Sequence, residues 1–143
     1  MIVLDTTVLV YATGSDHPLR EPCRELIRAI RRGSLTATTT GEAIQEFAHV
    51  RARRRDRADA VEVALAYVDL LAPLLPIEEA HLRQGLRLFE EHPQLGSFDA
   101  VLAAATLGVG AEALVSADRA FAVVSGLTHV DPATPAIESL LRG

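Results

Sequence analysis

Short apolar runs alternate with longer segments of helical periodicity along the chain. Residues 1–4 are apolar and predict a buried strand. Between Asp16 and Gly33, apolar residues recur three or four positions apart, which predicts a helix that Asp16 caps and Gly33 ends. By the same criteria we expect strands at 35–37, 113–115 and 127–130, and helices at about 41–54, 57–71, 78–91, 98–107 and 136–141.

Two of the helices carry recognisable start signals. Thr39 and Glu42 have the spacing of a capping box, and Ser97 stands where the 98–107 helix needs an N-cap. Pro73 and Pro76 bracket a short apolar stretch that predicts one more strand. Strands that alternate with helices over 143 residues predict one α/β domain, residues 1–143, with a mainly parallel sheet.

Two acidic residues stand just beyond predicted strands. Asp5 directly follows the first strand, and Asp118 lies three residues past Val115. Parallel α/β sheets place their sites at the carboxyl ends of the strands, so we expect both carboxylates at the same edge of the sheet. Because a buried carboxylate without a partner is costly or takes up a proton, this edge needs a compensating group.

Two further acids are expected near that edge, because helix N-termini in this architecture point toward it. Asp99 opens a small apolar helix whose dipole favours a negative charge; the alternative is a first-turn acid with no other role. On the 41–54 helix we favour Glu46 over Glu42. Glu42 already has a place in the capping box, whereas Glu46 lies one turn further, beside apolar neighbours, and lacks a partner.

Four acids in one pocket must either hold protons or bind a hard cation. Two carboxylates about 4 Å apart repel by about 4 kcal/mol at an effective dielectric constant of about 20. Donors that are all oxygen suit Mg²⁺ or Mn²⁺, and such an ion can activate water and clamp a phosphodiester for cleavage. The sequence therefore predicts a divalent metal site built by Asp5, Glu46, Asp99 and Asp118.

The composition argues against several other chemistries. All 14 basic residues are Arg, and the absence of Lys removes Schiff-base catalysis and P-loop phosphate binding. The single Cys23 and the five scattered His residues lack zinc-ligand spacing, although His49 could face the acidic site from its position three residues after Glu46. No G-x-S-x-G motif supports Ser/His/Asp hydrolysis, and four Phe with two Tyr are few for a base-stacking reader.

The formal net charge of −5 hides an uneven distribution. Residues 20–57 contain ten Arg and five acids, a local +5, while the rest of the chain has four Arg and fourteen acids, a local −10. The Arg residues beside the apolar stripe of the first predicted helix are expected to be solvated. The densest basic run could bind RNA phosphates or an acidic partner segment, or could cover a solvated helix end: Arg51, Arg53, Arg54 and Arg55.

The sequence predicts a cytoplasmic protein without membrane association. The polar residues 5–7 come too early for the apolar core of a cleavable signal. No apolar stretch approaches the roughly 18 residues of a membrane span.

Four motifs in order resemble PIN-domain proteins, above all the VapC toxins of bacterial toxin–antitoxin pairs: Asp5-Thr6-Thr7-Val8-Leu9-Val10-Tyr11, Glu46-Phe47, Phe98-Asp99-Ala100 and Leu114-Val115-Ser116-Ala117-Asp118. The resemblance covers nearly the whole chain. It implies an α/β/α sandwich around a mainly parallel sheet of four to five strands, commonly a homodimer. It also implies a Mg²⁺- or Mn²⁺-dependent endoribonuclease that a VapB antitoxin holds inactive.

The same resemblance assigns roles to individual residues. It places the catalytic and metal-binding quartet at Asp5, Glu46, Asp99 and Asp118. It makes two hydroxyls supports of the metal or its water, those of Thr7 and Ser116. The family often has Asn or Ser in place of Thr7 and Thr in place of Ser116, so an oxygen is retained at both positions.

Three functional hypotheses remain open at this point. The first is a toxin in which a metal-bound water attacks the RNA phosphorus and leaves 5′-phosphate and 3′-hydroxyl ends. The second is a catalytically silent binding module of the same fold, acting through its Arg-rich helix or antitoxin interface. The third is a metal-dependent nuclease that acts on DNA.

Overall fold

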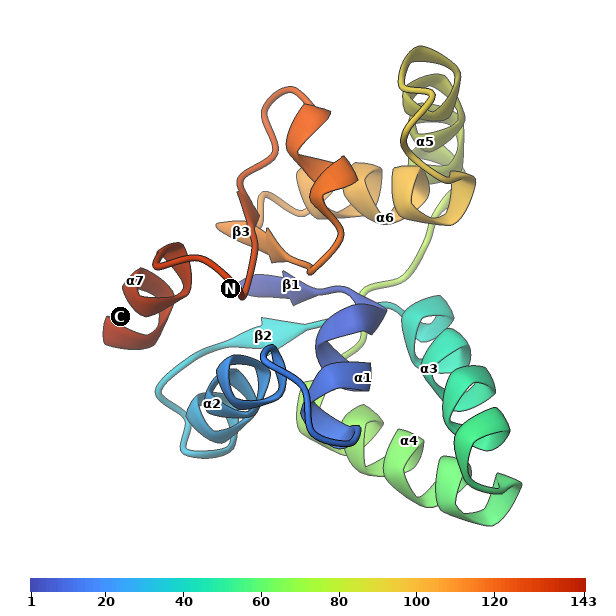
Figure 1. The fold of residues 1–143 in the computed structure, drawn as a ribbon. Coiled ribbons are helices and arrows are strands. Elements are labelled where there is room, and N and C mark those ends of the chain that lie inside the picture. Colours follow the sequence, from blue (N-terminus) through green and yellow to red (C-terminus); the bar gives the residue numbers. More distant parts are fainter.

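Four short parallel strands form a single sheet in the computed structural model, which describes residues 1–143. The order across the sheet is β2-β1-β3-β4, so that the first strand of the chain has a neighbour on each side (Figure 1). Val3 lies opposite Thr38 on one side and Leu114 on the other. The strands are β1 (Ile2–Leu4), β2 (Ala37–Thr38), β3 (Ala113–Val115) and β4 (His129–Val130).

The parallel sheet and two of its strands confirm the sequence prediction closely. β1 and β3 lie where residues 1–4 and 113–115 were expected, whereas β2 is shifted toward the C-terminus and β4 keeps only the last two residues of 127–130. The strand predicted between Pro73 and Pro76 is wrong. Leu75 forms only an isolated parallel bridge with Thr40, because the flanking prolines lack the N–H groups that a longer ladder needs.

Helices occupy most of the remaining chain. The helix predicted at residues 57–71 is confirmed to the residue, and those at 41–54, 78–91, 98–107 and 136–141 are found within one residue. None of the helices combines the length and the apolar character that a membrane span requires. The helices are α1 (Thr6–Thr13), α2 (Arg20–Arg31), α3 (Gly41–Arg54), α4 (Arg57–Leu71), α5 (Glu79–Glu91), α6 (Ser97–Gly108) and α7 (Ala136–Arg142), with a short 3₁₀ helix η1 (Arg119–Val123).

Helix α1 was not predicted from the sequence. It begins directly after β1, and Asp5 is its N-cap, with a side chain that accepts a hydrogen bond from the Thr7 backbone N–H. The helix has only eight residues, and its buried face is formed by Val8, Leu9 and Ala12. The same Asp5 that interrupts the apolar pattern is therefore the signal for a helix start.

The capping box predicted for α3 is wrong. Thr40, not Thr39, is the N-cap, and its hydroxyl accepts a hydrogen bond from the Ala43 N–H at 3.1 Å. The Thr39 hydroxyl instead donates to the Leu4 carbonyl at 2.7 Å and ties this loop to β1. Glu42 consequently lies in the first turn of α3 without a partner in Thr39.

Two other predicted caps also differ by a few residues. Gly96 is the N-cap of α6, and Ser97 is the first residue of that helix. Helix α2 starts later than expected, with Leu19 rather than Asp16 at its N-cap. Its end agrees with the prediction, since Gly33 follows it with a φ of 75°, a conformation that glycine adopts without strain.

The sheet is covered on both faces, as the α/β/α prediction required (Figure 1). Ile2 and Leu4 of β1 belong to one core cluster, which includes residues of α1, α2, α3, α4 and α7. Val3, whose side chain points to the opposite face, packs in a second cluster with residues of α6 and η1. All three residues of β1 are fully buried, so the first strand lies at the centre of the molecule.

Helix α5 approaches α6 closely at a glycine. A Cβ at Gly85 would lie 2.6 Å from the Cα of Val101, which is shorter than any tolerable contact. The missing side chain therefore allows the two helices to pack backbone to backbone. This contact matters for the site, because α5 and α6 together form one wall of the cleft described below.

Candidate active site

The carboxylate of Asp5 is buried at the carboxyl end of β1, in a residue only 4% exposed. Its Oδ2 accepts hydrogen bonds from Ser116 Oγ at 2.7 Å, from Thr7 Oγ1 at 2.9 Å and from the Thr7 N–H at 3.4 Å. Three donors thus satisfy an oxygen that burial would otherwise leave unpaired. Thr7 and Ser116, expected to support a metal or its water, lie here as donors that orient Asp5.

The two hydroxyls also fix the loop that follows β3. Thr7 Oγ1 accepts the Ala117 N–H at 3.0 Å, and Ser116 Oγ accepts the Asp118 N–H at 3.0 Å. Each hydroxyl therefore donates its single proton to Asp5 and accepts a backbone N–H from the loop. This network joins the loop that carries Asp118 to the end of β1, although more than one hundred residues separate them in the sequence.

Glu46 lies on the solvent-exposed side of α3 rather than enclosed by apolar neighbours. Its Oε2 accepts a hydrogen bond from Thr6 Oγ1 at 3.1 Å, and Thr6 is a buried residue next to Asp5. The partner that Glu46 was expected to need is therefore a hydroxyl from the first residue of α1. Thr6 was missed in the sequence because α1 was not predicted.

Asp99 lies half-buried in the first turn of α6. The negative charges of the three other acids act on its carboxyl group. Burial raises the pKa of Asp99 to about 7, and the negative charges of Asp5, Asp118 and Glu46 contribute in the same direction. The four acids selected from the sequence are thus close enough to interact electrostatically. The repulsion among them favours a proton on Asp99 over a fourth negative charge.

The donor chemistry of this cluster fits a hard cation. All four side chains offer carboxylate oxygens, and a divalent cation would relieve the repulsion that raises the pKa of Asp99. As the side chains stand, no three Asp, Glu, His or Cys residues form a set that could hold a metal ion by themselves. Mg²⁺ commonly binds through one or two carboxylates and keeps several waters, so a closed protein cage is not needed for it.

The acids open into a cleft of about 690 Å³ between α3 on one side and α5 with α6 on the other. Asp5, Glu46 and Asp99 line its acidic part, and Asp118 lies outside the lining. Glu42, assigned in the sequence to a capping box, also lines it, as does His49, which the sequence suggested could face the acidic site. The opposite wall is apolar and was not predicted; it comprises Ile77, Leu82, Leu86, Phe98, Val101 and Leu102.

The basic run at the end of α3 divides into one structural and three exposed residues. Arg51 makes two hydrogen bonds of 3.1 Å to the carboxylate of Asp59 and so joins α3 to α4. This side chain is only 15% exposed, and the ion pair removes it from the set of free basic groups. Arg53, Arg54 and Arg55 are exposed and have no acidic partner.

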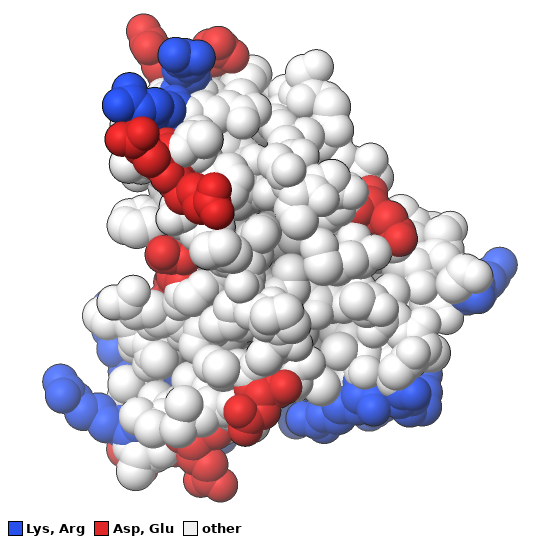
Figure 2. Space-filling view, turned by 180° about the vertical axis from the view of Figure 1, so that it is seen from behind, with Lys and Arg blue, Asp and Glu red and all other residues white.

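Viewed from behind, the molecule carries basic side chains along its lower edge, where α2, α3 and α4 lie (Figure 2). The upper edge, over α5, carries acidic and basic side chains together. The basic side chains at this edge lie in separate groups, with acidic side chains between them (Figure 2).

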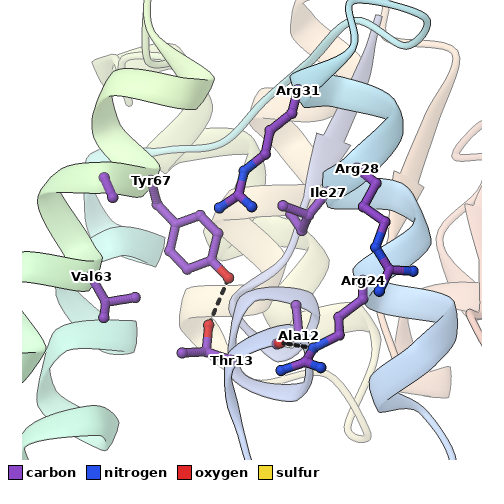
Figure 3. A pocket seen from close by; sticks show the side chains of 9 residues that line it. Ala12, Thr13, Arg24, Ile27, Arg28, Arg31, Val63 and Tyr67 are labelled. Atoms are coloured by element: carbon purple, nitrogen blue, oxygen red, sulfur yellow. Dashed lines mark hydrogen bonds between the residues drawn. The ribbon is translucent and has the colours of Figure 1, made fainter.

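A second cavity, of about 350 Å³, lies between the end of α1, α2 and α4 (Figure 3). Arg24, Arg28 and Arg31 line it. Arg28 and Arg31 are exposed, as expected from the sequence, whereas Arg24 is half-buried. On its floor the Tyr67 hydroxyl lies 2.6 Å from Thr13 Oγ1. Because Thr13 ends the helix that Asp5 caps, this cavity is about 12 Å from the acidic site, one α1 length away.

Comparison with known proteins identifies the family of the chain. Residues 2–127 match the PIN domain family. The chain belongs to the PIN domain family. Its sequence is 54% identical to ribonuclease VapC7 of Mycobacterium tuberculosis over 99% of this chain and 98% of that protein. It is 38% identical to ribonuclease VapC23 of the same species, over 69% of this chain and 78% of that protein.

Solved PIN-domain-like structures show the same fold. The crystal structure of VapBC2 from Rickettsia felis, bound to a DNA fragment from its promoter, has a TM-score of 0.71. That match covers 92% of this chain and 98% of the other, at 16% identity. PAE2754 from Pyrobaculum aerophilum matches with a TM-score of 0.64 and 22% identity, covering 99% and 93% of the two chains. The resemblance to VapC proteins noted in the sequence motifs is confirmed.

The raised pKa of Asp99 predicts how the stability of the metal-free protein depends on pH. Asp99 binds its proton more tightly in the folded than in the unfolded chain, where the pKa is near 3.8. The stabilisation from this proton is complete below pH 3.8 and is lost as the pH rises through about 7. With a chelator present, the melting temperature of the wild type should therefore fall relative to that of Asp99→Asn between about pH 4 and 7 and stay level with it above that range.

Thermal denaturation of both proteins across this range measures the difference directly. The Asn variant provides the control, because it keeps the size of the side chain and cannot titrate. Melting temperatures that change in parallel with pH would contradict the electrostatic coupling of Asp99 to its acidic neighbours.

Proposed function

We propose that this protein is a Mg²⁺- or Mn²⁺-dependent endoribonuclease and the toxin of a type II toxin–antitoxin pair. The observation that carries the proposal is the convergence of four acids from four separate segments: burial raises the pKa of Asp99 to about 7, and the negative charges of Asp5, Asp118 and Glu46 add to this effect. Membership of the PIN domain family and 54% identity to a VapC ribonuclease support RNA as the substrate.

Each residue has a distinct part in this proposal. Asp5, Glu46, Asp99 and Asp118 would hold the cation, which when bound would supply an activated water and neutralise charge on the phosphodiester. Ser116 and Thr7 keep the Asp5 carboxylate in one orientation through bonds of 2.7 and 2.9 Å. Thr6 restrains Glu46 through its 3.1 Å bond. The expected products carry 5′-phosphate and 3′-hydroxyl ends.

Replacing a carboxylate by its amide should remove cleavage without unfolding the protein. Asp5→Asn and Asp99→Asn keep the side-chain volume but remove a negative charge, so the rate of RNA cleavage in Mg²⁺ should fall by about 10²–10³-fold or more. Removal of divalent ions with a chelator should abolish the activity of the wild type. Asp69→Asn, an exposed aspartate on α4, is the matched control and should cleave like the wild type.

The same assay separates the competing hypotheses. A DNA strand of the same sequence should remain intact; preferential cleavage of DNA would assign the protein to the third class. Full activity in both Asp5→Asn and Asp99→Asn, with unchanged folding by circular dichroism, would remove the acidic site from the mechanism. An inactive wild type that still binds RNA or an antitoxin would indicate the silent binding module.

We also propose that the exposed end of the basic run binds the RNA backbone. Arg53 lies two helical turns, about 10 Å, beyond Glu46 on the same helix, close enough for one strand to reach both places. Three Arg residues that neutralise phosphates of a single strand release counterions, and each contact makes the affinity more salt-dependent. Arg51 is excluded from this role by its ion pair with Asp59.

A triple variant tests this assignment. Replacing Arg53, Arg54 and Arg55 by Gln should weaken RNA binding, lower the slope of log affinity against log salt by about 2, and leave kcat unchanged. The control variant replaces Arg83, Arg87 and Arg142, which are exposed elsewhere, and carries the same change of charge. An unchanged salt slope in the first variant, or an equal loss in both, would contradict a specific role for the run.

The proposed partner is a VapB-type antitoxin. A similar fold occurs in the VapBC2 complex of Rickettsia felis, which supports a paired antitoxin for this chain as well. The exposed Arg53, Arg54 and Arg55 at the end of α3 would suit an acidic antitoxin segment. A homodimer and a cytoplasmic location, both expected from the sequence, remain predictions.

A further inference from the structure

Phe98 is the most exposed large apolar side chain of the protein, at 79%. It lies in the first turn of α6, directly before Asp99, and lines the acidic cleft. Two of the other three Phe residues, Phe47 and Phe121, are almost completely buried. The remaining one, Phe89, is 46% exposed on α5 and does not line the cleft.

The fold offers no structural reason for this exposure. Burying a Phe side chain contributes about 1.5–3 kcal/mol, and this contribution is forgone at position 98. Phe98 has no capping function either, because Gly96 is the N-cap of α6 and a phenyl ring cannot accept a hydrogen bond from a backbone N–H in the manner of Ser or Asp. An aromatic face left open beside a charged site is available for a ligand.

The cleft has two chemically different walls. Asp5, Glu46 and Asp99 supply carboxylates, and Phe98 shares the lining with an apolar group formed by Ile77, Leu82 and Leu86. Leu82 and Leu86 are themselves 46% and 49% exposed. A nucleotide has the same division, with a charged phosphate on one side and a flat, apolar base face on the other.

We propose that Phe98 stacks on an unpaired nucleobase next to the phosphodiester that is cleaved. Phe98 and Asp99 line the same cleft, so a base stacked on Phe98 would have its phosphate within that cleft, where the carboxylates and the proposed cation lie. A base must leave its helix to stack in this way, and the site therefore selects single-stranded over double-stranded RNA. This inference rests on the proposed ribonuclease function and names the conformation of its substrate.

Kinetics with altered RNA test the stacking directly. The bond cut by the wild type is first mapped in a short single-stranded RNA, and abasic sites are then placed on either side of it. Phe98→Ala should lower kcat/KM for the intact RNA about 5- to 150-fold, the range expected for the loss of one base–aromatic stack. Phe98→Trp should retain activity, and Phe89→Ala, which removes the other exposed Phe, should not change it.

The abasic RNA distinguishes stacking from a structural defect. One abasic position should reduce wild-type cleavage by a factor similar to that of Phe98→Ala, and should have little further effect on that variant. Equal sensitivity of both proteins to every abasic position would overturn the inference. So would an unchanged kcat/KM in Phe98→Ala, or a loss explained by dissociation of a dimer in size-exclusion chromatography, which would assign Phe98 to a contact with a second copy.

The activity of the wild type distinguishes a failure of the proposed ribonuclease function from a failure of the proposed role of Phe98. A wild type that does not cleave RNA in Mg²⁺ refutes the proposed function, and the stacking role falls with it. A wild type that cleaves RNA while Phe98→Ala cleaves equally well refutes only the role of Phe98.

Discussion

A carboxylate held inside the protein at the end of the central strand is the constraint on which the rest of the structure depends. Asp5 can be buried there only if donors reach it, and the donors are Ser116 and Thr7. Ser116 reaches it because β3 pairs in parallel with β1, with Val115 opposite Leu4. Thr7 reaches it because α1 begins at Asp5 and turns its first residues back toward the sheet.

The same arrangement determines the electrostatics of the cleft. With Asp5 fixed, the N-terminal parts of α3 and α6 bring Glu46 and Asp99 toward it. Burial, with repulsion by the neighbouring acids added, raises the pKa of Asp99. Either a proton or a bound cation reduces the repulsion among these carboxylates. The cation is the group that the proposed cleavage of RNA requires. The apolar wall across the cleft, supported by the close contact of α5 and α6 at Gly85, gives the site a second surface.

Much of this site could be predicted from the sequence, because the acids break the apolar pattern at points that parallel topology brings together. Asp5 and Asp118 follow strands, and Asp99 opens a helix, so their common location follows from the architecture alone. The bounds of α4 could also be predicted, because its helical periodicity lies between Asp56, which caps it, and Pro73, which follows its end.

The parts that were missed depend on contacts between distant segments. Helix α1 is too short to show a clear period, and its start is visible only through the cap at Asp5. The choice of Thr40 over Thr39 as N-cap depends on the Leu4 carbonyl, which occupies the Thr39 hydroxyl. In the same way, Arg51 forms an ion pair with Asp59 of the next helix, so its charge is not free to bind a ligand. A pattern along the chain does not record such partners.

We propose that a divalent cation balances the acids at this edge of the sheet when the protein is active. Calorimetric titration of the metal-free protein with Mg²⁺ or Mn²⁺ tests it without reference to any substrate. We expect saturable binding to the wild type and loss of that binding in the Asp5→Asn, Asp99→Asn double variant. Absence of binding in the wild type, or equal binding in the double variant, would contradict it.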